Sequence, residues 1–139
     1  MQNKGPRLST GIIPILRTET ATKYLLLRSF NYWDFPKGSV EKDENPFEGA
    51  QRELEEETGI NQVSFPYGEV FVETPPYNHG KVARYYLGEV KSEKVEMGIN
   101  PELGTPEHQE YRWVTYKEAQ KLLGPRLLTV LQWAYNLVA

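Results

Sequence analysis

Residues 38–60 of this 139-residue chain read GSVEKDENPFEGAQRELEEETGI, and both ends of a helix can be recognised within them. Asn45 is a favourable N-cap, Pro46 suits the first helical position, and Glu48 can complete a capping box. Gly59 is the expected end, because the residue after a helix often adopts a left-handed backbone that glycine tolerates. The pattern therefore predicts a helix from about residue 46 to residue 58.

The acidic face of this helix is unusual. Glu53, Glu56 and Glu57 are spaced i, i+3, i+4, so their carboxylates share one face. Like charges at this spacing destabilise a helix by roughly 0.2–0.5 kcal/mol per pair, and the helix dipole disfavours anions near the C-terminus. A solvated acidic face is one interpretation. A hard divalent cation, Mg²⁺ or Mn²⁺, would remove the repulsion and use the oxygens as ligands, so the pattern also favours a metal site.

The stretch also matches a known motif at every fixed position. The matching residues are Gly38, Glu44, Arg52, Glu53, Leu54, Glu56, Glu57, Gly59 and Ile60. From background residue frequencies, a chance match at one starting point is on the order of 10⁻¹⁰. The chain thus resembles the Nudix hydrolases, which cleave nucleoside diphosphates linked to another group. The resemblance implies a mixed central sheet with a loop–helix–loop motif beside it.

Length and composition are typical of one soluble globular domain that spans residues 1–139. The net charge of −3 argues against broad non-specific binding to nucleic acid. The absence of cysteine excludes a disulfide framework and a thiolate metal site. There is no apolar run of the roughly 20 residues that span a bilayer, and MQNKGPRLS lacks an apolar signal region. The expectation is a cytoplasmic protein without a membrane partner.

The rest of the chain mixes strands and helices without a regular alternation, which predicts an α+β fold, or mixed α/β/α sandwich. Strands are expected at 9–16, 23–28, 63–73 (as one strand or two), 81–90 and 111–115, and helices at 116–123 and 126–137. Pro14 indicates an edge or a bulge for the first strand. Residues 31–37 and 74–80 are expected to be loops, and 91–105 a polar loop that faces the substrate.

Three segments outside the motif resemble the asymmetric diadenosine tetraphosphate hydrolases. They are WDFPKG at 33–38, KVARYYLGEV at 81–90 and EHQEYRW at 107–113. Two positions depart from that group. Ser39 stands where a histidine is usual, and Thr74 stands where a base-stacking tyrosine is expected. Tyr77, in the same loop, is the alternative candidate for stacking.

The expected metal ligands are oxygens of the motif: Glu53, Glu56, Glu57 and the carbonyl of Gly38. Arg52 can hydrogen-bond a carboxylate and hold its rotamer without competing as a ligand. One carboxylate near the metals must accept the proton of the attacking water, and Glu53 and Glu107 are both candidates. The resemblance places Glu44 at the periphery of the metal site. His79 and His108 are not spaced like a zinc ligand set and are interpreted as non-ligands.

Lys37, Lys81 and Tyr77 are the candidate substrate contacts. The two lysines would neutralise phosphates, and Tyr77 would stack a base. An ordinary solvated lysine and a tyrosine that only packs are the alternatives for Lys81 and Tyr77.

Three functions agree with these residues. The first is Mg²⁺-dependent hydrolysis of diadenosine tetraphosphate to ATP and AMP. The second is another Nudix pyrophosphohydrolase, acting on an RNA 5′-triphosphate end or a nucleoside triphosphate. The third is a non-catalytic nucleotide-binding module, whose expected signature, loss of motif carboxylates, is absent here.

Overall fold

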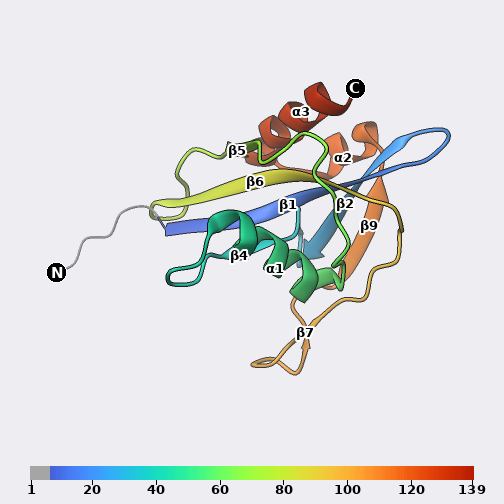
Figure 1. Ribbon diagram of the computed structural model, residues 1–139. Helices are drawn as coiled ribbons and strands as arrows, with labels where there is room; N and C mark the ends of the chain where they lie inside the picture. Colours follow the sequence, from blue (N-terminus) through green and yellow to red (C-terminus); the bar gives the residue numbers. More distant parts are fainter. Residues whose placement is uncertain (1–6) are drawn as a thin grey trace.

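The computed structural model describes residues 7–139, and its centre is a mixed sheet (Figure 1). The strands of this sheet are β1 (Arg7–Arg17), β2 (Thr22–Ser29), β3 (Tyr32–Asp34), β4 (Lys37–Ser39), β5 (Phe71–Glu73), β6 (Lys81–Val90) and β9 (Glu110–Val114). The main order is β3-β2-β1-β6-β5, with β4 paired to β1 and β9 paired to β2. β1 and β6 run parallel, and the other pairs are antiparallel. The expected mixed sheet is therefore confirmed.

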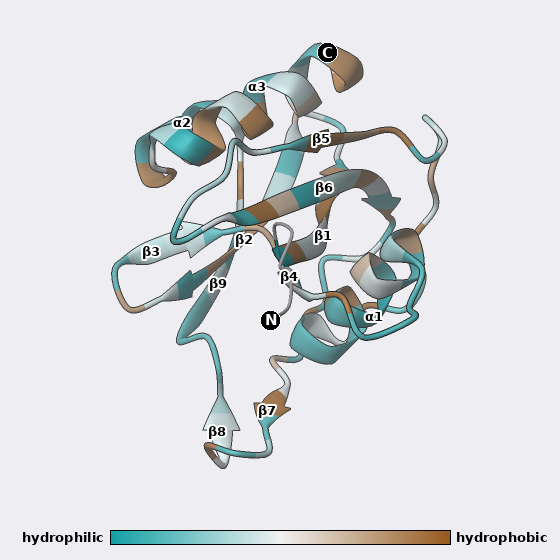
Figure 2. Cartoon of the chain, turned by 90° about the vertical axis from the view of Figure 1, so that its left-hand side faces the viewer, coloured by the Kyte–Doolittle hydropathy of each residue, from teal (hydrophilic) through white to brown (hydrophobic). Residues whose placement is uncertain are grey.

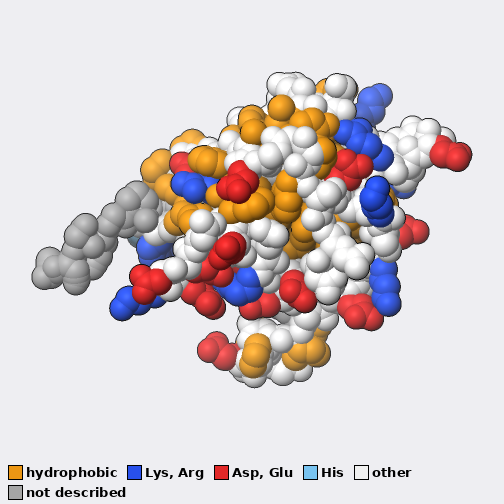
Figure 3. Space-filling model, in the orientation of Figure 1, with side chains coloured by type: hydrophobic (Ala, Val, Ile, Leu, Met, Phe, Trp, Pro, Cys, Tyr) orange, Lys and Arg blue, Asp and Glu red, His pale blue; other side chains and the backbone are white. Residues whose placement is uncertain are grey.

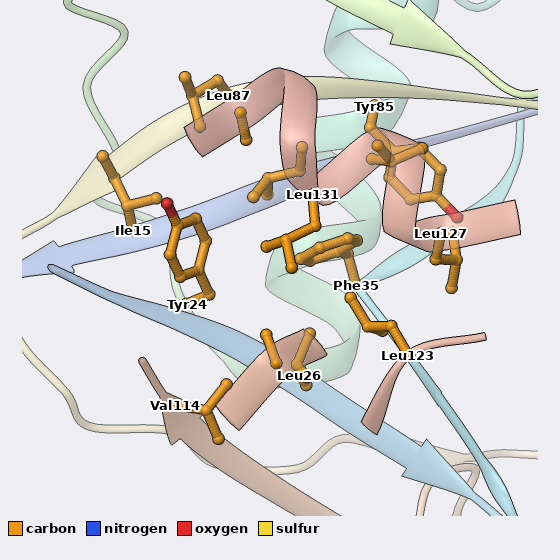
Figure 4. Packing of buried hydrophobic residues seen from close by; sticks show 14 of the residues in the cluster. Ile15, Tyr24, Leu26, Phe35, Tyr85, Leu87, Val114, Leu123, Leu127 and Leu131 are labelled. Carbon is orange, nitrogen blue, oxygen red and sulfur yellow. The ribbon is translucent and has the colours of Figure 1, made fainter. Parts of the chain in front are cut away.

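Helices cover both faces of the sheet. α1 (Pro46–Thr58) lies on one face, and α2 (Tyr116–Leu122) and α3 (Pro125–Val138) lie on the other (Figure 1). The alternation along β2 explains this arrangement, since Leu25 and Leu27 pack in the cluster under α1. Tyr24 and Leu26 point the other way and pack with Leu131 of α3 (Figure 4). A strand that is buried on both faces needs a continuous apolar run. The α/β/α sandwich is confirmed.

The edge position that Pro14 indicated for the first strand is wrong. β1 lies inside the sheet, between β2 and β6, and Pro14 pairs with Gly88 of parallel β6. On its other side β1 pairs with β4 as far as Gly11 and with β2 only from Ile15 onwards. Pro14 falls in the gap between these two ladders, where no strand needs the N–H group that proline lacks.

Several boundaries differ from the sequence predictions. The strand at 81–90 has the predicted bounds, but of 63–73 only Phe71–Glu73 is a strand, with a separate bridge between Ser64 and Glu89. The predicted loop at 31–37 contains β3 and the start of β4. The loop at 91–105 carries a short hairpin formed by β7 (Ile99–Asn100) and β8 (Thr105–Pro106).

The β7–β8 hairpin projects away from the sandwich (Figures 1 and 2). Its Ile99 and Leu103 are more than half exposed. No helix in residues 7–139 is long and apolar enough to cross a membrane.

Candidate active site

The helix that carries the acidic face begins and ends where the sequence predicts. The Asn45 side chain accepts hydrogen bonds from the N–H groups of Phe47 (2.8 Å) and Glu48 (3.2 Å). Gly59 ends the helix at φ 76° and donates to the carbonyl of Glu55 (2.8 Å). Leu54 is fully buried against the sheet, which fixes the rotation of α1 about its axis. With this rotation, the side of α1 that carries Glu53, Glu56 and Glu57 faces β4. Figure 3 shows acidic side chains gathered over α1, with basic side chains among them.

Arg52 is the centre of an ion-pair network. Its Nε donates to Glu44 (2.8 Å), and its Nη1 donates to Glu53 (3.1 Å) and to Glu56 (3.1 Å). Its Nη2 donates to the carbonyl of Ser39 (3.0 Å). The hydrogen bonds from Arg52 lower the pKa of Glu44 to about 2. The sequence suggested a hydrogen bond from Arg52 to one carboxylate, and the structure shows bonds to three carboxylates and to the β4 backbone. Arg52 thus holds three carboxylates in place.

Glu57 is the most strongly perturbed acid of the motif. Its Oε1 accepts a hydrogen bond from the backbone N–H of Lys37 (3.2 Å). Burial, followed by the carboxylates of Glu53 and Glu107, raises the pKa of Glu57 to about 9. Burial also raises the pKa of Glu53, against the opposing effect of Arg52. Both carboxylates would ionise more easily if a cation lay between them.

Gly38 brings the β4 backbone against the Glu53 carboxylate. A Cβ atom at this position would overlap the carboxylate atoms of Glu53. No residue with a side chain fits here unless Glu53 moves, so glycine allows this close approach.

Glu107 and His108 complete the acidic cluster from the opposite wall. One ligand atom each from Glu57, Glu107 and His108 lie within 4.8 Å of one another. Burial lowers the pKa of His108, which favours the neutral imidazole that can act as a ligand. The sequence interpretation of His108 as a non-ligand missed this proximity. The one indication in the sequence was that His108 directly follows Glu107. The sequence positions alone could not show that both residues lie close to Glu57.

These side chains line a cleft of about 410 Å³. Its lining residues are Glu53, Glu56, Glu57, Met97, Gly98, Ile99, Asn100, Pro101, Glu107 and His108. The donors are carboxylate oxygens with one imidazole, a set that suits a hard or borderline divalent cation. Residues 97–101 also line this cleft, so part of the 91–105 loop lies at the candidate site.

The same loop caps the C-terminal end of α1. The N–H of Glu96 donates to the carbonyl of Thr58 (2.9 Å), and the N–H of Gly98 donates to the carbonyl of Glu57 (3.2 Å). The last carbonyls of a helix have no partner within it, so these bonds stabilise the turn that carries Glu57. A Cβ on Gly98 would overlap the carbonyl oxygen of Glu56. The loop can therefore reach the helix only if residue 98 is glycine.

We expect Gly98→Ala to push the loop off the end of α1. The substitution should lower kcat/KM by about tenfold or more. The reason is that the loop that lines the cleft would lose its hydrogen bonds to the last turn of α1, which carries Glu57. Thermal unfolding should show a loss of about 1–3 kcal/mol. Gln62→Ala is the control, since Gln62 is exposed and does not line the acidic cleft. Equal kcat/KM values for Gly98→Ala and Gln62→Ala would contradict this role of the loop.

The three predicted substrate contacts lie in different surroundings. The Lys37 ammonium lies 3.5 Å from Asp34. Burial lowers the pKa of Lys37, but the negative charge of Asp34 and other neighbours have the larger combined effect, so the pKa is raised. The Tyr77 ring lies under the guanidinium of Arg126, with Cζ 3.9 Å from the ring centroid. Lys81 begins β6 and exchanges backbone hydrogen bonds with Tyr77, but it does not line the acidic cleft. The structure thus brings the backbone of Lys37 to Glu57, while its ammonium group pairs with Asp34. None of the three predicted contacts lines the acidic cleft. His79 lies in the turn before Lys81 and does not join the acidic cluster.

Comparison with known proteins identifies the family. A family model described as NUDIX domain matches residues 5–134. The asymmetrical bis(5′-nucleosyl)-tetraphosphatase of Mus musculus is 36% identical over 117 residues, which cover 80% of this chain and 76% of that protein. An RNA pyrophosphohydrolase of Pseudomonas putida is 28% identical over 150 aligned positions, which cover 84% of this chain and 92% of that protein.

Solved structures share the fold. A binary complex of C. elegans Ap4A hydrolase has a TM-score of 0.80 at 20% identity, over 94% of this chain and 97% of that one. The NUDIX domain of Shewanella oneidensis NrtR, solved with ADP ribose, has a TM-score of 0.73 at 17% identity, over 98% of this chain and 91% of that one. With the complete motif arranged around an acidic cleft, these matches lead to one conclusion: the chain belongs to the Nudix family and is a Nudix hydrolase.

Proposed function

We propose that this Nudix pyrophosphohydrolase cleaves diadenosine tetraphosphate asymmetrically, to ATP and AMP, and that it needs Mg²⁺. The observation that carries the proposal is the cluster of Glu53, Glu57 and Glu107 carboxylates at the cleft, whose mutual repulsion a divalent cation would relieve. The relative at 36% identity supports this substrate. Mn²⁺ is a possible substitute, since it takes the same oxygen ligands.

The residues fit the cation in the following way. Glu53, Glu56, Glu57 and the Gly38 carbonyl would hold it, with Glu107 and His108 on the opposite wall. A bound Mg²⁺ supplies positive charge that stabilises the developing charge on phosphate oxygens and acidifies water.

The chain's own groups carry out the rest of the reaction. Water attacks one phosphorus of the tetraphosphate, its oxygen forms the new P–O bond, and the bridging P–O bond on the opposite side breaks. Glu107 or Glu53 accepts the proton of that water. Glu53 already accepts a hydrogen bond from Arg52, which occupies one of its carboxylate oxygens, whereas Glu107 is exposed in the cleft. This difference favours Glu107. Lys37 offsets the negative charge of the phosphates.

Tyr77 and Lys81 complete the proposal as contacts to the more distant part of the substrate. Tyr77 lies close enough to Lys37 to influence its electrostatics, so a substrate that reaches Lys37 could extend toward Tyr77. Because Arg126 covers one face of the Tyr77 ring, a base would meet the Tyr77–Arg126 pair rather than the bare ring.

A competition assay tests the substrate. Diadenosine tetraphosphate, ATP, a nucleotide sugar and a 5′-triphosphorylated RNA are mixed at equal concentration with the enzyme and Mg²⁺. We expect the dinucleotide to be consumed first and EDTA to stop all cleavage. The second candidate is hydrolysis of RNA 5′ ends, which the 28% identical RNA pyrophosphohydrolase favours. Faster loss of pyrophosphate from the RNA would support that candidate and overturn the first.

The dependence of stability on pH offers a separate test of the metal site. The pKa of Glu57 rises from its ordinary value of 4.5 to about 9 on folding, because of burial and then Glu53 and Glu107. The folded metal-free protein therefore binds a proton that the unfolded chain has lost between these two pH values, so its stability falls as pH rises through this range. Mg²⁺ binds the ionised carboxylate.

We therefore expect Mg²⁺ to raise the Tm by several degrees more at about pH 8.5 than at about pH 5.5. Differential scanning fluorimetry with EDTA or MgCl₂ measures this difference. An equal effect of Mg²⁺ at both pH values would count against Glu57 as a ligand.

A further inference from the structure

A second cavity, of about 690 Å³, lies where three distant segments meet. Residues 31–34 come from the β2–β3 turn and β3, residues 77–78 from the loop before β6, and residues 122–127 from the junction of α2 and α3. The volume is in the range of small-molecule sites in proteins. Its lining combines aromatic rings, amides and one guanidinium, a mixture that suits a nucleotide better than a purely apolar ligand.

Arg126 is the exceptional group of this cavity. Its guanidinium lies over the Tyr77 ring, and its Nη1 atom is buried without a hydrogen-bond partner among residues 7–139. An unsatisfied guanidinium nitrogen is costly, and in native proteins it usually indicates a missing water or ligand. Two other arginines also lie over aromatic rings, but each pairs with a carboxylate. Arg84 donates to Glu73 (2.8 Å) and Arg112 donates to Glu110 (2.7 Å).

Asp34 lines the same cavity, but its carboxylate already has other partners. Asp34 accepts hydrogen bonds through Oδ1 from the Tyr85 hydroxyl (2.8 Å) and the Phe35 N–H (2.6 Å). Its Oδ2 faces the Lys37 ammonium at 3.5 Å. No ion pair joins Arg126 to an acidic residue of the described chain. The positive charge of Arg126 thus remains uncompensated within the cavity.

Lys37 connects this cavity with the acidic cleft. Its backbone N–H bonds Glu57, while its ammonium group lies 3.5 Å from Asp34, which lines the second cavity together with Arg126. A polyphosphate chain held at the acidic cluster and directed past Lys37 would therefore meet Arg126 next. Two cations along one path suit successive phosphates, and a guanidinium can hold phosphate oxygens in a bidentate manner.

We propose that Arg126 binds a phosphate of the nucleotide arm that extends from the acidic cleft into this cavity, with Tyr77 as the support for its guanidinium. The assignment rests on the proposed function, because it takes the polyphosphate to be bound at the acidic cluster. It makes Arg126 a residue that selects substrates with a long polyphosphate chain and a second nucleoside.

Kinetics with diadenosine tetraphosphate and Mg²⁺ test this role through Arg126→Leu, which keeps an apolar side chain over Tyr77. We expect KM to rise about tenfold or more, as for loss of a charged hydrogen bond, with kcat changed less than about threefold. Arg126→Lys should give an intermediate KM, and it serves as the test if the leucine variant does not fold. Arg84→Leu, which removes an arginine from another aromatic ring, should keep the wild-type KM.

Binding of ATP in EDTA, measured by calorimetry, separates this assignment from the proposed function. We expect wild type to bind ATP and Arg126→Leu to bind it about tenfold more weakly. If wild type does not cleave the dinucleotide but this difference persists, the proposed function fails and the role of Arg126 stands. Equal ATP affinity in the two proteins, or no ATP binding by wild type, would overturn the role of Arg126.

Discussion

Glu57→Gln should lower kcat by about 10²–10³-fold at saturating Mg²⁺, the scale seen when a preorganised electrostatic group is removed. Glu57 is the central acid of the cluster, because it is half-buried beside Glu53 and lies close to Glu107 and His108. The amide keeps the shape of the side chain and removes only its charge. Steady-state kinetics at several Mg²⁺ concentrations measure the loss.

The same substitution should stabilise the metal-free protein above about pH 7. Burial, together with Glu53 and Glu107, raises the pKa of Glu57, so folding must protonate this group, whereas glutamine needs no proton. Glu55→Gln is the matched control, since Glu55 is exposed on the same helix and away from the cleft. Near-wild-type turnover of Glu57→Gln at saturating Mg²⁺ would remove Glu57 from the metal site.

Gly38→Ala is the second substitution with a large expected effect. The added methyl group would occupy the position of the Glu53 carboxylate, so either β4 or Glu53 must move. Displacement of Glu53 would also break its hydrogen bond with Arg52 (3.1 Å). We expect kcat to fall about 10²-fold, since small displacements of catalytic groups have effects of this size.

Thermal unfolding of Gly38→Ala should show a loss of at most about 1 kcal/mol, because the added methyl group meets the movable end of the Glu53 side chain rather than backbone. Gln62→Ala again serves as the control, because Gln62 is exposed and lies outside both cavities. A kcat within threefold of wild type would mean that Glu53 can shift without consequence, and its assignment as a ligand would fail.

The local parts of the fold were predictable because their signals lie within a few residues. Asn45, Pro46 and Gly59 define α1 through short-range hydrogen bonds and backbone preferences. The spacing of Glu53, Glu56 and Glu57 places them on one side of a helix whatever surrounds it. The long strand at 81–90 was also predictable, since β-forming residues such as Val82, Tyr85, Tyr86 and Val90 recur along it.

The parts that depend on strand order were not predictable in the same way. Glu107 and His108 reach the acidic cluster because β9 pairs with β2, and no local pattern indicates that pairing. Pro14 indicated an edge, but β1 changes its antiparallel partner from β4 to β2 at that point and needs no N–H group there. Arg126 begins the helix expected at 126–137, in which the sequence predicted no site residue. Arg126 contacts the ring of Tyr77, which lies 49 positions earlier in the sequence, so no local pattern indicates this contact.

The most direct test of the central claim is product analysis of diadenosine tetraphosphate cleaved in ¹⁸O-labelled water with Mg²⁺. The proposed function predicts equal amounts of ATP and AMP by chromatography, one ¹⁸O atom in a single product, and no reaction in EDTA. Formation of ADP alone would show symmetric cleavage. That result, or the absence of cleavage with both Mg²⁺ and Mn²⁺, would contradict the assignment of this cleft to asymmetric dinucleotide hydrolysis.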